Sequence, residues 1–176
     1  MENKMFCFQC EQTAGCSGCT GKVGVCGKNA DVAALQDKLT GELIGLVRVT
    51  GDVVPTGNIL KLIIEGLFTT LTNVSFNEQT LNELIEKVRA ERERLVPQCF
   101  ACASPCGTNN EYDLSHIWTD NEDIRSLKSL ILFGIRGMAA YAYHAMVLGY
   151  TNDEVSHFFV KALFALGEDW EMDKLL

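Results

Sequence analysis

The chain has 176 residues, 47% of them apolar and 22% charged, which is the composition of a globular protein rather than of a disordered one. Its formal net charge of −8 provides no basic patch for a nucleic acid or an anionic membrane, so we expect neither as a partner. Eight cysteines and an N-terminus without an apolar signal segment predict a cytoplasmic protein whose thiols bind a metal rather than form disulfides.

The first predicted segment, residues 1–30, is a cysteine-rich loop. Turn-forming residues surround its thiols, and four thiolates from such a loop can bind a tetrahedral zinc ion or an iron–sulfur cluster. The two Cys-x2-Cys pairs of a zinc ribbon are usually separated by about 12 to 20 residues. Here only five residues separate Cys10 from Cys16, and neither common ferredoxin spacing fits. On spacing alone, an iron–sulfur cluster, zinc, and disulfides or free thiols all stay open.

The second segment, residues 31–96, is predicted to be a three-helix bundle. Asp31 is the expected N-cap of its first helix and Asn77 that of its third. The charged run from Glu91 to Arg94 should be a solvated helix end. Apolar residues recur at helical spacing in three stretches, which run from Val32 to Leu46, from Ile59 to Leu71 and from Leu81 to Val88.

The third segment, residues 97–120, is a linker with three more cysteines, Cys99, Cys102 and Cys106. Three thiolates leave one position of a tetrahedral metal open, which His116 or Cys16 would complete to form a second metal site. The alternatives are a buried thiol patch that fixes the linker, or a disulfide.

The last segment, residues 121–176, is predicted to be a second helical bundle. Asn121 and Asn152 are the expected N-caps of its two helices, and a further helical pattern stops at Leu176. We therefore expect this bundle to be incomplete and the chain to be truncated. The predicted fold class is all-α, with two small helical bundles and an N-terminal cysteine-rich loop.

The longest apolar stretch lies in this last segment, from Leu130 to Tyr150. Arg136 interrupts it, so we expect a buried core helix rather than a membrane span. Gly134 and Gly137 would allow another helix to approach closely. The aromatic side chains that we expect in the core are Tyr141, Tyr143, Phe158 and Phe159.

Several runs of residues resemble one known family. The run MFCFQCEQT from Met5, together with VCGK at residues 25–28, strongly resembles the N-terminus of the hybrid-cluster proteins, also called prismane proteins or hydroxylamine reductases. The runs NEDIRSLKSL from Asn121 and GMAAYAYHA from Gly137 are similar to the same family. The resemblance therefore covers most of the chain.

The resemblance implies an electron-transfer cluster on the first loop. The spacing C-x2-C-x8-C-x6-C is similar to that of members with a [4Fe–4S] cluster, and a [2Fe–2S] cluster is the alternative. Cys16 has no place in this pattern, and we expect Gly18, Gly24 and Gly27 to donate backbone N–H groups to sulfur. The ligands that the resemblance implies are Cys7, Cys10, Cys19 and Cys26.

In this family the helical domain is followed by two α/β domains with a hybrid iron–sulfur–oxygen cluster, which reduces hydroxylamine to ammonia and is also credited with nitric oxide reduction. The resemblance implies that this chain is the electron-transfer domain alone, without the hybrid cluster and inactive by itself towards substrate. Its implied partners are the missing C-terminal domains and an external electron donor, and its exposed apolar faces would favour a homodimer. The alternative is a non-enzymatic helical module whose cysteines bind zinc or form a structural or regulatory clip.

Overall fold

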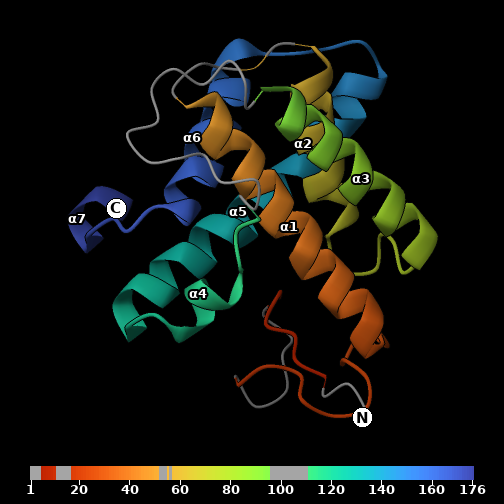
Figure 1. The fold of residues 1–176 in the computed structure, drawn as a ribbon, viewed down its shortest axis with the longest axis vertical. Coiled ribbons are helices and arrows are strands. Elements are labelled where there is room, and N and C mark those ends of the chain that lie inside the picture. The colour runs from red at the N-terminus through yellow and green to blue at the C-terminus, as the bar shows by residue number, and fades with distance from the viewer. Residues whose placement is uncertain (1–4, 11–16, 52–54, 56, 96–110) are drawn as a thin grey trace.

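The computed structural model of the chain describes residues 5–10, 17–51, 55, 57–95 and 111–176. These residues form helices and no strand, which confirms the predicted all-α class (Figure 1). The short helices α4 and α7 lie against α5. The seven helices are α1 (Ala30–Thr50), α2 (Asn58–Thr69), α3 (Glu78–Leu95), α4 (Ser115–Thr119), α5 (Glu122–Val147), α6 (Asp153–Gly167) and α7 (Met172–Leu175), counted within the described ranges.

Polar side chains determine where the long helices begin. Asn29, not the predicted Asp31, caps α1, because its Oδ1 accepts a hydrogen bond from the Val32 N–H at 2.7 Å. Asp31 lies in the first turn, where its charge favours the N-terminal end of the helix dipole. The other predicted caps are confirmed, each accepting a backbone N–H at 3.0 Å: Asn77, Asn121 and Asn152.

Apolar side chains from α1 to α6 form one buried cluster. Helix α1 lies in its middle and packs against α2, α3 and α6, as its path across the molecule in Figure 1 shows. Leu39, Leu43 and Leu46 of α1 are fully buried there. The two predicted helical groups therefore share a single core.

Helix α5 is buried on one side only, so the prediction of a buried core helix is wrong for its outer face. Leu132, Ile135 and Ala139 point into the core, whereas Leu130 and Tyr141 are 68% and 83% exposed. Among the described helices, α5 alone is long and apolar enough to cross a membrane, with 22% of its most apolar window buried. Core helices of soluble proteins meet the same criterion, so this is weak evidence for a membrane span.

The predicted aromatic core is correct for two of its four members. Phe159 is fully buried, and Tyr143 stacks on Phe68 with 4.5 Å between ring centroids. Tyr141 and Phe158 lie at the surface, because their helices turn these positions away from the shared core.

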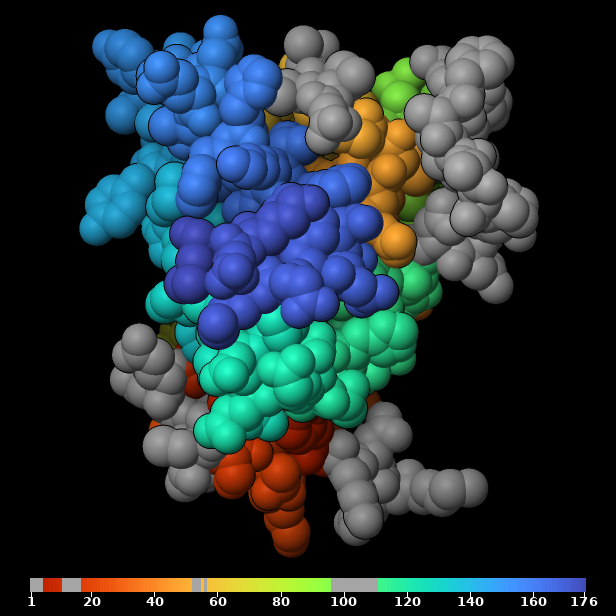
Figure 2. All heavy atoms as spheres, turned by 90° about the vertical axis from the view of Figure 1, so that its left-hand side faces the viewer, coloured from red at the N-terminus to blue at the C-terminus, as the bar shows by residue number. Residues whose placement is uncertain are grey.

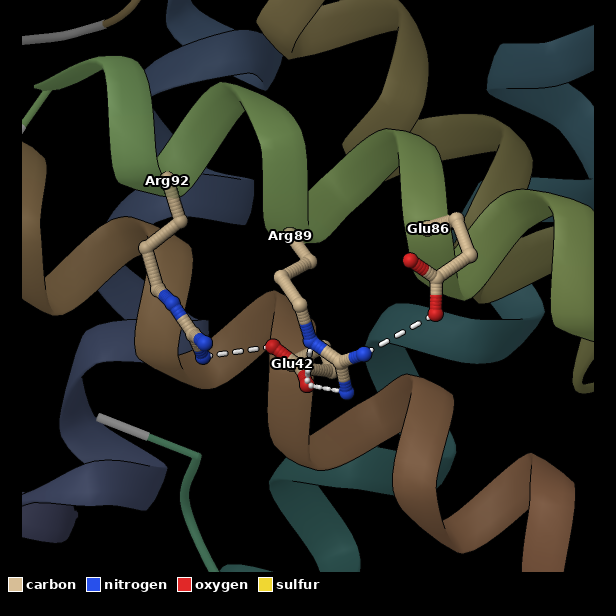
Figure 3. Close-up of polar contacts among 4 residues, drawn as sticks. All are labelled: Glu42, Glu86, Arg89 and Arg92. Atoms are coloured by element: carbon tan, nitrogen blue, oxygen red, sulfur yellow. Dashed lines mark hydrogen bonds and ion pairs between the residues drawn. The ribbon is translucent and has the colours of Figure 1, made fainter. Parts of the chain in front are cut away.

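A buried ion-pair cluster joins α1 to α3 (Figure 3). The Glu42 carboxylate on α1 has no exposed surface and accepts hydrogen bonds from Arg89 at 2.8 Å and from Arg92 at 2.5 Å. Arg89 also pairs with the exposed Glu86 at 2.9 Å. The expectation of a solvated helix end is therefore wrong for Arg92, which is 4% exposed, because α1 supplies a buried carboxylate opposite it.

The glycines at which the chain packs closely are not the two predicted, and Gly41 is the tightest of them. Gly134 and Gly137 lie on the exposed side of α5, where an added Cβ would meet nothing within 4 Å. Gly41 lies on the buried side of α1, and a Cβ there would be 2.1 Å from the carbonyl oxygen of Tyr112. The backbone that leads into α4 therefore rests directly on α1.

We expect Gly41→Ala to destabilise the protein by about 1–3 kcal/mol or more, because the backbone of Tyr112 would have to move. Gly134→Ala is the matched control, since it adds the same methyl group to a helix in open space. It should stabilise the protein by about 0.5–1 kcal/mol. Urea unfolding measures both changes, and similar effects of the two substitutions would contradict the contact between Gly41 and Tyr112.

Candidate metal centre

The cysteine-rich segment lies at one end of the molecule, beyond the N-terminal end of α1 (Figure 1). Figure 2 shows this end from another side, below α4 and the start of α5. Phe8 contacts Trp118 of α4, with 5.4 Å between ring centroids. Cys7 and Cys19 pack with Ala33 of α1, so the segment contacts both α1 and α4.

Two hydrogen bonds connect the two halves of this segment. The Cys7 N–H donates to the Cys19 carbonyl at 3.1 Å, and the Cys19 N–H donates to the Cys7 carbonyl at 2.8 Å, as an isolated antiparallel bridge. Gly18 and Gly27 have φ angles of +91° and +85°, so the loop uses glycine for left-handed turns. This backbone geometry places cysteines from separate runs side by side.

The structure brings the four predicted ligand cysteines to one small pocket. All four are free thiols, with Cys7 and Cys19 buried and Cys10 and Cys26 half-buried. Among the described residues, no three His, Cys, Asp or Glu side chains lie close enough together to hold a single metal ion. The four thiols therefore line a common pocket.

The predicted second set of ligands lies outside the described residues. This applies to Cys99, Cys102 and Cys106, and also to Cys16. His116, proposed to complete that site, is exposed on the short helix α4.

The predicted N–H donors to sulfur are wrong for two of the three glycines. The Gly24 N–H donates to the Lys28 carbonyl at 2.8 Å, and the Gly27 N–H donates to the Gly24 carbonyl at 2.9 Å. These bonds close the turn that carries Cys26, and the contribution of Gly18 stays a prediction. The Gln9 backbone instead favours the ionised Cys7 thiol and lowers its pKa against the effect of burial.

Lys28 is a buried cation beside this pocket. Its side chain is part of the pocket wall, and the residue is 2% exposed. Its Nζ donates to Gln9 Oε1 at 3.2 Å and lies 3.8 Å from Cys7 Sγ. Burial raises the pKa of the Cys7 thiol, and the ammonium group of Lys28 opposes this shift. Lys28 therefore favours a thiolate at Cys7.

Arg136 is a second buried cation, supplied by α5. Its Nε donates to Thr70 Oγ1 at 3.0 Å, one Nη to Thr40 Oγ1 at 2.9 Å, and the other Nη to the Gln9 carbonyl at 3.4 Å. Burial lowers the pKa of Arg136 to about 10, with Asp37 opposing the shift. The guanidinium group stays charged at neutral pH and connects α1, α2 and α5 to the cysteine segment.

Asp37 is the acidic residue of this network. The Gln9 amide donates to its carboxylate, and burial raises the pKa of Asp37 to about 6, against the effects of Gln9 and of the Arg136 charge. One carboxylate, even when ionised, does not balance two buried cations. Since buried charges need compensation, the donor set and its surroundings fit a group of net negative charge, such as a metal cluster bound by thiolates.

The sequence interpretation missed Lys28, Gln9 and Arg136. Two signals were available: a lysine directly after the last cysteine turn, and an arginine within an otherwise apolar helix. Neither signal says which residues the cation contacts, because Arg136 and Gln9 are 127 positions apart.

The chain is similar in sequence to one protein family over most of its length. A model of the Prismane/CO dehydrogenase family matches residues 5–176. The chain is similar to the hydroxylamine reductase of Clostridium perfringens (strain 13 / Type A), with 37% identity over 94% of this chain and 34% of the relative. It is 35% identical to the hydroxylamine reductase of Clostridium novyi (strain NT), over 98% of this chain and 35% of the relative. It is 38% identical to the hydroxylamine reductase of Methanocaldococcus jannaschii, over 97% of this chain and 34% of the relative. The chain therefore spans about a third of the length of these relatives.

Proposed function

Because the chain belongs to the Prismane/CO dehydrogenase family, which implies iron–sulfur cofactors, we propose that it is the electron-transfer part of a hydroxylamine reductase. The observation that carries this proposal is the set of four free cysteines around one pocket at the end of the molecule. A [4Fe–4S] cluster would be bound there, with [2Fe–2S] as the alternative. The proposed ligands are Cys7, Cys10, Cys19 and Cys26.

The family supports a cluster over a single zinc ion, because Prismane/CO dehydrogenase proteins imply iron–sulfur cofactors. Four thiolates from one loop could bind either group. The surplus of buried positive charge from Lys28 and Arg136 also favours an anionic group.

An iron–sulfur cluster supplies one-electron transfer, and the protein determines from which side the electron arrives. Cys7 and Cys19 pack with Met5 and Ala33 on the side of the helices. Cys10 is half-buried and borders a second hollow, which is also lined by Phe133 and Arg136. We therefore place the approach of an external electron donor on the Cys10 side.

The exposed apolar surface supports a larger assembly. A hollow of about 820 Å³ lies between α2, α5 and the start of α6, and Leu60, Met138 and Tyr141 are among its lining residues. Apolar surface of this kind marks a contact site. In the proposed function it contacts the part of a hydroxylamine reductase that reduces the substrate, and a second copy of this chain would bind there in its absence. The expected location is the cytoplasm, where thiols stay reduced.

Iron, sulfide and zinc analysis with EPR, on protein purified without oxygen, tests this function. About four irons and four sulfides per chain are expected for a [4Fe–4S] cluster, and about two of each for [2Fe–2S]. Zinc without sulfide would contradict electron transfer and support the alternative of a non-enzymatic helical module with a zinc clip.

A further inference from the structure

Lys28 and Arg136 differ from the other buried cations of this protein. Arg92 faces the Glu42 carboxylate at 2.5 Å, and Lys128 faces Asp120 at 3.7 Å. Lys28 and Arg136 are each 2% exposed, yet neither forms an ion pair within 4 Å among the described residues. A buried cation without a counter-ion is costly, so the two positive charges need an explanation.

Apart from the Cys7 sulfur, towards which Lys28 Nζ donates at 3.8 Å, the hydrogen-bond partners of the two cations are neutral. Lys28 donates to the Gln9 side chain, and Arg136 donates to the Gln9 carbonyl and to two threonine hydroxyls. Asp37 is joined to them only through the Gln9 amide. Gln9 lies between Cys7 and Cys10 in sequence, so both cations meet at one residue next to these cysteines, Lys28 at its side chain and Arg136 at its carbonyl.

We propose that Lys28 and Arg136 are positioning residues that raise the reduction potential of the cluster bound at the four cysteines. This inference rests on the proposed function, namely that an iron–sulfur cluster occupies the pocket. When a donor supplies one electron, the bound group becomes more negative by one charge, while no bond forms or breaks and both cations keep their protons. Nearby buried positive charge stabilises that extra electron, because screening by water is weak there.

The test is an EPR-monitored redox titration of the cluster-containing protein and its variants. Lys28→Met removes the charge and keeps the length of the side chain, whereas Lys28→Arg keeps the charge. We expect Lys28→Met to lower the ratio of reduced to oxidised cluster at least about tenfold at a fixed potential, which is 59 mV for a one-electron couple. Lys28→Arg should match the wild type. Lys161→Met, on the exposed side of α6, is the matched control and should change nothing.

Each result decides the proposal. An unchanged potential in Lys28→Met overturns it. If Lys28→Met fails to retain iron while Lys28→Arg retains it, the potential of Arg136→Met decides the proposal: a lower potential supports it and an unchanged one overturns it. If neither variant retains iron, the shape of the lysine rather than its charge is needed, which overturns the proposal. Arg136→Met should shift the potential in the same direction as Lys28→Met, and an unchanged value would remove Arg136 from the pair. Wild-type protein without iron and sulfide would instead refute the proposed function itself.

Discussion

Cys10→Ser is expected to leave most of the protein without its cluster. Cys10 is half-buried and belongs to both hollows at this end of the molecule, so it is the proposed ligand best placed towards an approaching donor. A serine hydroxyl does not ionise like a thiol and is a poor replacement for an iron ligand. Anaerobic purification followed by iron and sulfide analysis should show a fall from about four of each per chain to below about one.

Cys16→Ser provides the matched control for this experiment. Cys16 lies in the same cysteine-rich run but has no place in the spacing C-x2-C-x8-C-x6-C. Its replacement should leave the iron and sulfide content at the wild-type level. A full cluster in Cys10→Ser would refute the proposed ligand set, and a loss in Cys16→Ser with retention in Cys10→Ser would exchange their roles.

The features that the sequence predicted are those encoded by neighbouring residues. Asn121 and Asn152 cap helices that begin directly after them, because a cap bonds an N–H three positions along the chain. The cysteine spacing is equally local, and the structure brings Cys7 and Cys19 together through one short bridge. The predicted cap Asp31 is two positions from the actual cap Asn29, because both are good capping residues and sequence pattern defines helix ends only within a residue or two.

The features that the sequence did not predict depend on contacts between distant segments. No larger residue fits at Gly41, because the backbone carbonyl of Tyr112 lies where a Cβ would be. At Gly134 the same space is open. The sequence around Arg92 predicts a surface residue. It is buried because Glu42 of α1, 50 positions away, lies opposite it. The charge of the candidate site has the same origin, because Arg136 reaches Gln9 from another helix.

Two buried charge clusters therefore have opposite designs. At Glu42 a carboxylate lies between two guanidinium groups, and the exposed Glu86 provides a further negative charge (Figure 3). At the cysteine pocket the positive charge exceeds the negative charge of Asp37. The charges of the first cluster are paired within the protein, so we expect this cluster to stabilise the folded state. The second becomes balanced only with an anionic group, so it should act in cofactor binding.

Glu42→Gln is expected to reduce the free energy of unfolding by about 3–5 kcal/mol, because it leaves the buried Arg92 without its carboxylate while keeping the size of the side chain. For a chain of this length the melting temperature should fall by on the order of 10 °C. Glu86→Gln is the matched control, since it removes a carboxylate from the same Arg89 at a site where the Glu86 side chain is 69% exposed. It should change stability by less than about 1 kcal/mol. Thermal melts of the two variants side by side make the comparison. Equal shifts would mean that the Glu42 cluster is no more important than a surface ion pair, and that buried charge in this protein does not need a partner, which would also weaken the argument for an anionic group beside Lys28 and Arg136.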